Sequence, residues 1–290
     1  MNAIDSQREA AITASSPIRL AQAQPVQPRA VGAALVRARG GSDGQTRLVD
    51  LRTSGALKLV FPRRRTGIEA VFVNTAGGVT GGDALSLTAS VEDRGSLTLT
   101  TQAAERAYRA QPGQTGQVTT GLSVGDEASL FWLPQELIVF EGCALSRRIE
   151  IDLAPSARLI FVEPVVLGRT AMGEQLHNIS LNDRIVVRRG GAPLFLDGVS
   201  LSGDAAREMT RQATGAGAGA YATLLVVDPN IQHSLGDVRA MLPDTAGASL
   251  VASDTLLLRL LATDGFALRT HLLPILDRLT GGTLPRSWRL

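Results

Sequence analysis

The sequence predicts an all-β dominated fold, a large stacked-sheet scaffold with about two α-helices towards the C-terminus. Three observations support this prediction. Hydrophobic and polar residues alternate with a period of two through the middle of the chain, as in half-buried strands. Turn signals recur about every ten residues, which favours a sheet assembly over β-α-β units. Helical spacing of leucines is confined to the last third of the chain.

The clearest strand pattern covers residues 84–92, where Leu85 and Leu87 lie on the predicted apolar face. A turn signal follows at Asp93-Arg94-Gly95, and residues 96–101 then resume the alternation. The two segments together predict a hairpin.

Two further strand pairs follow the same logic. Residues 148–153 alternate, and Pro155-Ser156 turns the chain into an apolar strand over residues 157–166. Residues 184–198 contain two strand-like runs separated by Gly190-Gly191. Glycine pairs favour tight turns, so this segment predicts another hairpin.

The helical signals come last. Leu256, Leu257, Leu260 and Leu261 fall on one helical face, with Ser253 or Asp254 as the N-cap, and they predict one helix. A second short helix is predicted over residues 267–279, with Pro274 kinking or starting it.

One domain is expected after a leader. The chain has 290 residues, of which 44% are hydrophobic, so a sizeable core is available. No linker divides residues 31–290, which we expect to form a single β-rich domain. Residues 1–30 lack periodicity and predict a flexible leader.

Composition also bears on location and partners. Cys143 is the only cysteine, which excludes an internal disulfide and a C-x-x-C site. No signal-peptide pattern and no membrane-spanning apolar run is present, so a cytoplasmic protein is expected. The net charge of +2 is too mild to indicate a nucleic-acid partner. The groups Arg63-Arg64-Arg65, Arg147-Arg148 and Arg188-Arg189 could form local patches, but solvated strand or turn faces are the favoured interpretation.

Two glycine-rich stretches raise the question of nucleotide binding. Gly77 and Gly82 have the separation of a phosphate loop, but Asp83 and Ala84 stand where lysine and a hydroxyl residue are required. The glycines at residues 215–217 precede a strand-like run, whereas a dinucleotide fingerprint opens a helix. Turns or loops are therefore predicted at both places.

Catalytic and metal signals are weak. Ser123 lies at the centre of a G-x-S-x-G string, but within β-like segments that do not suit a nucleophile elbow. The histidines His177, His233 and His271 are far apart and predict no preformed metal site. Acidic residues next to turns are harder to dismiss as candidate functional residues, although structural salt bridges are the favoured interpretation. These residues are Asp83, Glu136, Glu141, Glu163 and Glu174.

Several motifs in order carry a family resemblance. They are NTAGGVTGGD (74–83), TTQAAERAYR (100–109), WLPQE (132–136) followed by VFEG (139–142), EPVVLGRTAMGE (163–174) and LPRSW (284–288). In order and spacing the chain resembles the UreD family, also called UreH, of urease accessory proteins.

The resemblance implies a β-helix-like scaffold without catalytic residues. It implies a urease maturation chaperone that binds UreF, through it the GTPase UreG, and also apo-urease. Nickel(II) would pass transiently, with no tightly bound cofactor, and Asp83, Glu136, Glu163 and Glu174 are the candidate carboxylates on its path. The alternative is a hydrolase on a β-rich scaffold that uses Ser123 or a carboxylate pair.

Overall fold

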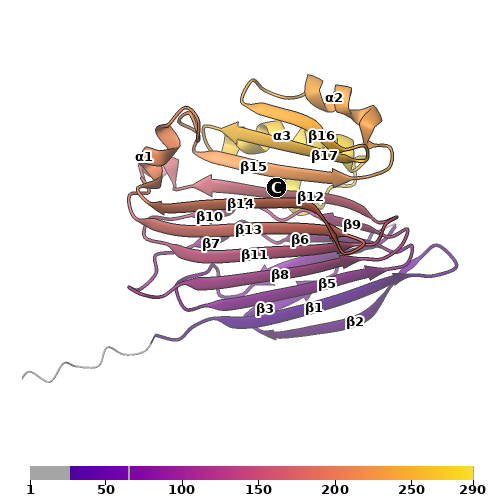
Figure 1. Ribbon diagram of the computed structural model, residues 1–290. Coiled ribbons are helices and arrows are strands. Elements are labelled where there is room, and N and C mark those ends of the chain that lie inside the picture. Colours follow the sequence, from indigo (N-terminus) through magenta and orange to yellow (C-terminus); the bar gives the residue numbers. More distant parts are fainter. Residues whose placement is uncertain (1–26, 65, 290) are drawn as a thin grey trace, which may run out of the picture.

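The computed structural model describes residues 27–64 and 66–289, and in this part of the chain the strands form two sheets (Figure 1). Sheet A contains, in spatial order, β14 (Ala192–Gly203), β13 (Ile179–Arg189), β11 (Ala144–Leu153), β8 (Gly116–Val124), β5 (Ala84–Glu92), β1 (Val31–Gly40) and β2 (Thr46–Gly55). Sheet B contains β16 (Ala246–Ala252), β17 (Thr255–Ala262), β15 (Ala220–Val227), β12 (Arg158–Leu167), β9 (Ser129–Trp132), β6 (Ser96–Thr101), β4 (Ile68–Asn74) and β3 (Leu57–Val60). The short strand β10 (Leu137–Val139) pairs with β12 and with β7 (Glu105–Ala107).

The chain winds between the two sheets as a β-solenoid. It runs from β4 in sheet B to β5 in sheet A, back to β6, and so on through β8, β9, β11, β12 and β13. Strands of successive coils pair in parallel, as β5 does with β8 and β6 with β9. The predicted all-β fold and the β-helix-like arrangement are confirmed.

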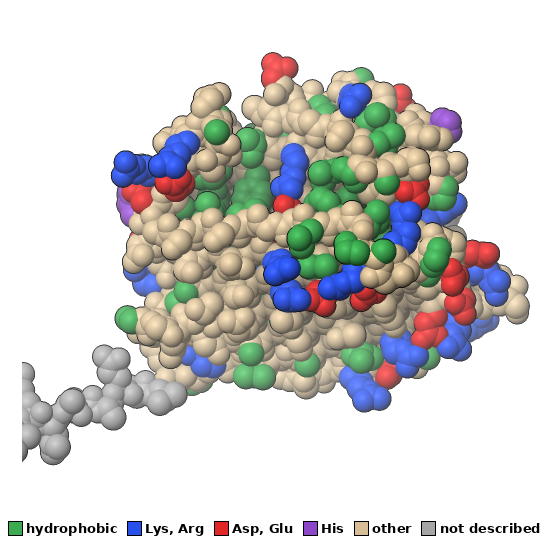
Figure 2. All heavy atoms as spheres, viewed as in Figure 1, with side chains coloured by type: hydrophobic (Ala, Val, Ile, Leu, Met, Phe, Trp, Pro, Cys, Tyr) green, Lys and Arg blue, Asp and Glu red, His purple; other side chains and the backbone are tan. Residues whose placement is uncertain are grey.

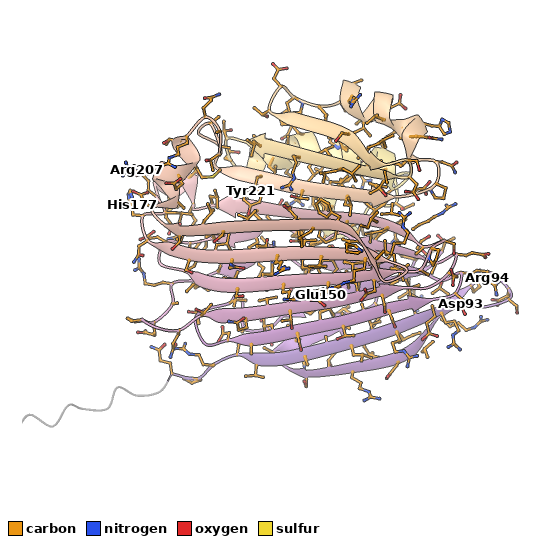
Figure 3. All side chains as sticks on the ribbon, viewed as in Figure 1. Asp93, Arg94, Glu150, His177, Arg207 and Tyr221 are labelled. Atoms are coloured by element: carbon orange, nitrogen blue, oxygen red, sulfur yellow. The ribbon has the colours of Figure 1, made fainter. Side chains whose placement is uncertain are left out.

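Each passage from sheet A to sheet B uses a short turn, and these turns stack at one end of the solenoid. They cover residues 93–95, 125–128 and 154–157. The N–H of Arg94 donates to the carbonyl oxygen of Asp126 at 2.9 Å, and the N–H of Ser129 donates to that of Gly95 at 2.8 Å. We call this the short-turn end, and Figure 3 labels Asp93 and Arg94 there.

The return from sheet B to sheet A uses longer connections at the opposite end. They cover residues 75–83, 102–115, 133–143 and 168–178, and they include the short strands β7 and β10. Neighbouring connections bond to each other, as when the N–H of Tyr108 donates to the carbonyl oxygen of Val79 at 2.8 Å. We call this the long-loop end, and Figure 3 labels His177 there.

The hairpin predicted over residues 84–101 is wrong. The turn at Asp93-Arg94-Gly95 exists, but β5 and β6 belong to different sheets and each pairs with strands of other coils. A turn signal marks the reversal and does not fix the pairing partner. The turn at Pro155-Ser156 is also a passage between sheets, whereas Gly190-Gly191 joins β13 and β14 in a true antiparallel hairpin.

A third layer, formed by the last two α-helices, covers sheet B. Among the described residues the α-helices are α1 (Ala205–Thr210), α2 (Leu235–Ala240) and α3 (Gly265–Leu279), and the 3-10 turns are η1 (Thr170–Met172), η2 (Ile231–Ser234) and η3 (Arg286–Arg289). One hydrophobic core lies between the two sheets. A second core lies between the outer face of sheet B and α3, where Leu268 and Leu272 pack against Leu224 and Leu258.

The helix predicted at Leu256 to Leu261 is wrong, because these residues form β17. Leu256 and Leu258 face the second core and Leu257 packs against the first, so the strand is apolar on both faces. A strand buried on both sides lacks alternation and imitates a helical run. The predicted helix over residues 267–279 is confirmed as α3, with Pro274 inside it and Asp264 as its N-cap.

The predicted leader lies mostly outside the described residues, since the structure describes the chain from Gln27 and β1 begins at Val31. Within the described ranges no helix is long and apolar enough to cross a membrane.

Trp288 closes the second core. Its side chain is fully buried, its Nε1–H donates to the carbonyl oxygen of Leu133 at 2.8 Å, and the guanidinium of Arg269 lies 5.1 Å from its ring centroid. The C-terminal segment is thereby fixed across the end of β9.

We expect Trp288→Ala to lower the free energy of unfolding by about 3–5 kcal/mol, because a large cavity opens in the core. Trp288→Phe should cost less, about 1–3 kcal/mol, because it chiefly leaves the Leu133 carbonyl unpaired. Urea denaturation measures both. Phe266→Ala is the control, since Phe266 is 83% exposed, and a loss equal to that of Trp288→Ala would contradict the assignment.

Candidate functional site

A charged layer interrupts the apolar core between the two sheets. The side chain of Arg147 on β11 points inward, as do those of Leu145 and Ile149, which lie two residues before and after it. In the sheet register Arg147 lies opposite Asp183 on β13. Its Nε donates to Oδ1 of Asp183 at 3.0 Å. Its Nη1 lies 2.5 Å from Oε2 of Glu163 on β12, so Arg147 joins the two sheets by ion pairs.

Glu163 is the most enclosed carboxylate of this layer. Its side chain is 3% exposed, and its Oε1 accepts a hydrogen bond from Nε1 of Trp132 at 2.5 Å. The contact of Oε2 with Arg147 is close but poorly aligned, and no other donor in the described ranges reaches this oxygen. One oxygen of a buried carboxylate is thus left without a well-formed hydrogen bond.

Burial dominates the titration of this layer. It raises the pKa of Glu163 despite the attraction of Arg147, and repulsion from Asp183 acts in the same direction. Burial also disfavours the charge of Arg147, but attraction by Asp183 and Glu163 outweighs it and raises the pKa of Arg147. Two carboxylates thus share one guanidinium in an apolar interior, an arrangement that is costly for folding and typical of functional sites.

A cavity of about 70 Å³ lies beside the charged layer. It has room for about two water molecules. Its lining is mostly apolar, and polar or charged residues contribute to it from both sheets and from the long-loop end. They are Thr101, Glu105, Thr120, Gln135, Arg147 and Glu163, whereas Ser86 and Thr119 line it from positions that alternate outward on β5 and β8.

Glu105 on β7 is a site residue that the sequence analysis missed. Its Oε2 accepts from Nδ2 of Asn74 at 3.1 Å, and its Oε1 accepts from the N–H of Arg106 at 3.1 Å. Burial raises the pKa of Glu105, and the nearby Asp83 adds a smaller contribution. The residue stands within a quoted motif, but a three-residue strand has no periodicity that would have revealed its orientation.

The polar layer extends towards the surface through Tyr221 on β15. Its hydroxyl is buried and has no hydrogen-bond partner among the residues described. Burial first, and then repulsion from Asp183, raises the pKa of Tyr221. The same side chain lines a groove of about 190 Å³ together with Val199, Leu201 and Arg259. Figure 2 shows hydrophobic side chains gathered over this seam between β14 and β15.

Asp83, a predicted nickel-path residue, lies at the long-loop end and is 5% exposed. Its two oxygens accept from the N–H groups of Ala30 and Thr80, each at 2.8 Å. It therefore ties the start of β1 to the glycine-rich turn.

Glu136 lies between β9 and β10 and pairs with Arg269 on α3 at 2.7 Å. The same guanidinium donates to Oε1 of Gln135 at 2.8 Å and to the carbonyl oxygen of Trp288 at 3.1 Å. Glu136 thereby helps to hold the helical layer on the solenoid.

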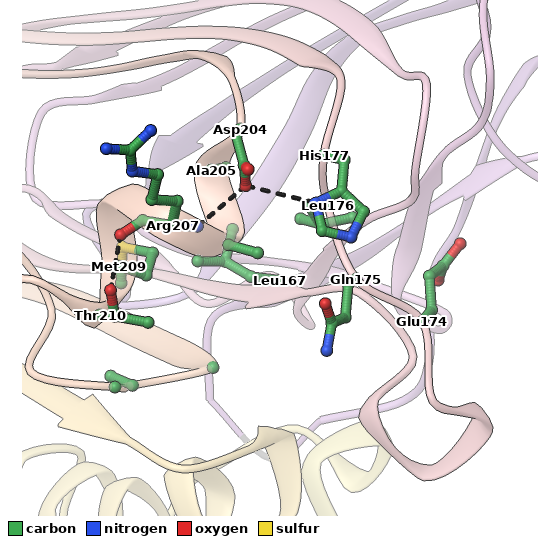
Figure 4. A pocket seen from close by; sticks show the side chains of 14 residues that line it. Leu167, Glu174, Gln175, Leu176, His177, Asp204, Ala205, Arg207, Met209 and Thr210 are labelled. Carbon is green, nitrogen blue, oxygen red and sulfur yellow. Dashed lines mark hydrogen bonds and ion pairs between the residues drawn. The ribbon is translucent and has the colours of Figure 1, made fainter.

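Glu174 follows η1 and forms a two-point pair with Arg169, at 2.9 and 3.1 Å. This hydrogen bonding holds the pKa of Glu174 below its usual value. Beside it lies a pocket of about 450 Å³, shown in Figure 4, where Nδ1 of His177 lies 3.5 Å from Oδ1 of Asp204.

The four predicted carboxylates do not meet at one point. Asp83, Glu136 and Glu174 lie on connections of the long-loop end, whereas Glu163 lies inside the solenoid. In the described ranges no group of three or more His, Cys, Asp or Glu side chains is arranged to hold a metal ion.

The alternative functions find no support in the local structure. Ser123 lies exposed within β8, without the strand-turn-helix geometry of a nucleophile elbow. The turn at residues 75–83 leads into β5 and the glycines at residues 215–217 lead into β15, so neither opens a helix. Gly78 is required because a Cβ there would lie 2.3 Å from Cε2 of Tyr108. Cys143 is 2% exposed, and burial raises the pKa of its thiol to about 11.

Comparison with known proteins decides the family. Residues 31–289 match the family described as UreD urease accessory protein. The chain belongs to the UreD family. A protein named Urease accessory protein UreD from Ruegeria sp. (strain TM1040) is 50% identical over 271 residues, 91% of each chain.

Further UreD relatives agree. The protein of that name from Roseobacter denitrificans (strain ATCC 33942 / OCh 114) is 46% identical over 269 residues, which cover 91% of this chain and 96% of that protein. The one from Rhizobium leguminosarum bv. viciae is 40% identical over 250 residues, which cover 86% and 91%. This UreD-family chain is thus an accessory protein with a role in urease maturation, and not an enzyme.

For the UreD charged layer, we expect Arg147→Met to lower the free energy of unfolding by about 3–5 kcal/mol, because two buried carboxylates lose their cation. The triple variant Arg147→Met, Glu163→Leu, Asp183→Leu should recover most of this loss. Urea denaturation measures both, with Arg148→Met as the control, since the Arg148 side chain is 50% exposed. A single variant as stable as the control would show that the layer is not buried.

Glu105 gives a pH test. The pKa of Glu105 in the folded protein lies above the ordinary value of 4.5, so the unfolded chain loses the carboxyl proton first as the pH rises. The free energy of unfolding therefore falls as the pH rises from 4.5 through the folded pKa. We expect Glu105→Gln to lack this fall, so its free energy of unfolding should rise relative to wild type as the pH rises above 4.5. A constant difference over that range would contradict the raised pKa.

Proposed function

We propose that this UreD-family protein is a maturation scaffold that passes nickel(II) through the polar space between its sheets to apo-urease. In this proposal it binds UreF, and through UreF the GTPase UreG, in a hetero-oligomer that docks on apo-urease. The lack of disulfide-forming cysteine pairs favours a cytoplasmic setting.

The observation that carries the proposal is Glu163. A β-solenoid interior needs no charge for its stability, and replacing a buried ion pair by apolar residues is often neutral or stabilising. Here a carboxylate whose Oε2 has an ion pair with Arg147 and no further partner in the described ranges lies beside a cavity in the middle of the core. Such a group is suited to receive a cation that arrives with part of its water shell.

The ligand chemistry fits a passing ion. Thiolates and imidazoles bind nickel and similar divalent ions tightly, whereas carboxylates and water bind them weakly and release them readily. Among the polar residues in the mostly apolar lining of the cavity are carboxylates and hydroxyls, with no histidine or cysteine. The nearby Arg147 would further weaken the binding of a dication by repulsion.

We propose that an ion comes in at the long-loop end and leaves by the groove at Tyr221. Glu105 and Glu163 are the transit ligands that the cavity supports best. Asp83, Glu136 and Glu174 stay in the proposal as carboxylates of the long-loop end, each already engaged by its own partners. An ion would have to compete with these partners, as it would with Arg147 and Trp132 at Glu163. We rank the three below Glu163 because they do not line the cavity.

The proposed partner contacts lie in the C-terminal half. Large apolar side chains are exposed there on α3, β14 and β16, at Phe266, Leu196 and Val251. Exposed apolar side chains and open sheet edges readily accept another chain.

We expect the double variant Glu105→Gln, Glu163→Gln to lower nickel-dependent activation of apo-urease at least tenfold while its co-purification with UreF and UreG stays unchanged. The amides keep the shape of both side chains and remove the charges that attract a dication. Urease activity after activation at limiting nickel is the measurement, and each variant's unfolding free energy is measured alongside.

Glu150→Gln is the matched control, since Glu150 lies on the outward face of β11 and outside the cavity. Full activation by the double variant would refute the passage between the sheets. Loss of UreF binding together with activation would instead point to a purely structural role for the two carboxylates.

A further inference from the structure

A basic pocket lies where the connection between β3 and β4 meets the C-terminal segment. Its volume is about 600 Å³. One wall is formed by Pro62, Arg63, Arg64, Thr66, Glu69 and Val71, and the other by Thr283, Leu284, Arg286 and Ser287. The second wall contains most of the LPRSW motif, whose arginine has no part in the passage between the sheets.

Arg64 holds the two walls together. Its Nη1 donates to Oγ1 of Thr98 at 2.6 Å, and its Nη2 donates to the carbonyl oxygen of Thr283, 219 residues away in sequence. Its Nε lies 3.3 Å from Oε2 of Glu69, which is buried at the base of the pocket. The positive charge of Arg64 is therefore paired with Glu69 within the protein.

Arg63 and Arg286 are different. Both are exposed and line the pocket, and neither forms a hydrogen bond or an ion pair within the described part of the chain. Many exposed arginines are engaged by carboxylates, as Arg37 and Arg39 are by Glu92, although Arg94 and Arg184 form no ion pair in the described ranges. Glu69, already paired with Arg64, is the only carboxylate that lines the pocket. The pocket thus keeps two guanidiniums without an ion pair among the residues described. Burial raises the pKa of Glu69, although the charges of Arg64 and then of Arg286 act on it in the opposite direction.

The remaining walls indicate the kind of ligand. Hydroxyl groups of Thr66, Thr283 and Ser287 alternate with the apolar side chains of Val71 and Leu284. A mixed lining suits a peptide that carries acidic and apolar side chains, because guanidiniums bind carboxylates at two points. Nucleic acid would require an extended basic stripe, and a single phosphate ion would leave most of this volume empty.

We propose that Arg63 and Arg286 form a docking site for an acidic segment of a protein partner. The charge complementarity of the pocket selects this occupant. The site lies outside the proposed nickel passage, so its test does not depend on that proposal.

The test uses the full chain and a fluorescein-labelled hexaglutamate peptide, with fluorescence anisotropy at about 50 mM salt, where surface charges are weakly screened. We expect saturable binding that weakens at least tenfold in Arg63→Glu, Arg286→Glu. The lysine variant Arg63→Lys, Arg286→Lys should fall between, because lysine keeps the charge but loses the two-point geometry.

Arg94→Glu, Arg184→Glu is the matched control, with the same change of net charge at two exposed arginines that form no ion pair in the described ranges. It should weaken binding less than twofold. Equal weakening by both pairs would show that only the overall charge matters and would overturn the proposal. No binding to the full chain would do the same, as would displacement of the peptide by inorganic phosphate at equal ionic strength. Unchanged unfolding free energies in all variants exclude misfolding.

Discussion

The contact of Arg147 with Glu163 and Asp183 joins the two sheets at the centre of the molecule. A solenoid coil places one strand in each sheet, so inward side chains of different coils meet in layers. Most layers are apolar and need only to fill space. The charged layer contains buried ionisable groups that need partners. This requirement fixes the geometry of Trp132, Glu163, Arg147 and Asp183.

The charged layer is also where the fold departs most from what stability alone would favour. Burial raises the pKa of Glu163 and Glu105, so the interior disfavours the charged form of both carboxylates. An apolar replacement would suit the core equally well or better. Retaining carboxylates beside a cavity in the core is understandable if the interior serves a cation in passage, as we propose for this UreD-family protein.

Local patterns in the sequence predicted local structure well, and pairing between distant segments poorly. The strand over residues 84–92, the hairpin at Gly190-Gly191 and the helix α3 follow from periodicity and turn chemistry. The partner of each strand depends on the winding of the coils, which a short turn such as Asp93-Arg94-Gly95 does not encode. Strand β17 was mistaken for a helix because both of its faces are buried.

The same limit applies to the site. Glu163 could be singled out as an acidic residue in an apolar run, and the phase of Arg147 with Leu145 and Ile149 would have placed it inside the fold. The approach of Asp183, Glu105 and Tyr221 to this layer results from the stacking of coils far apart in sequence. No spacing rule within one segment contains that information.

The two ends of the solenoid differ in how much change in length they tolerate. A residue added within the stacked turns at 93–95 or 125–128 would shift a whole coil against its neighbours and break the bonds from Arg94 to Asp126 and from Ser129 to Gly95. Connections at the opposite end have slack to absorb an insertion. Evolutionary gains and losses of residues in this architecture should therefore collect at the end that also carries Asp83, Glu136 and Glu174, so that new surface can be acquired without disturbing the register of the coils.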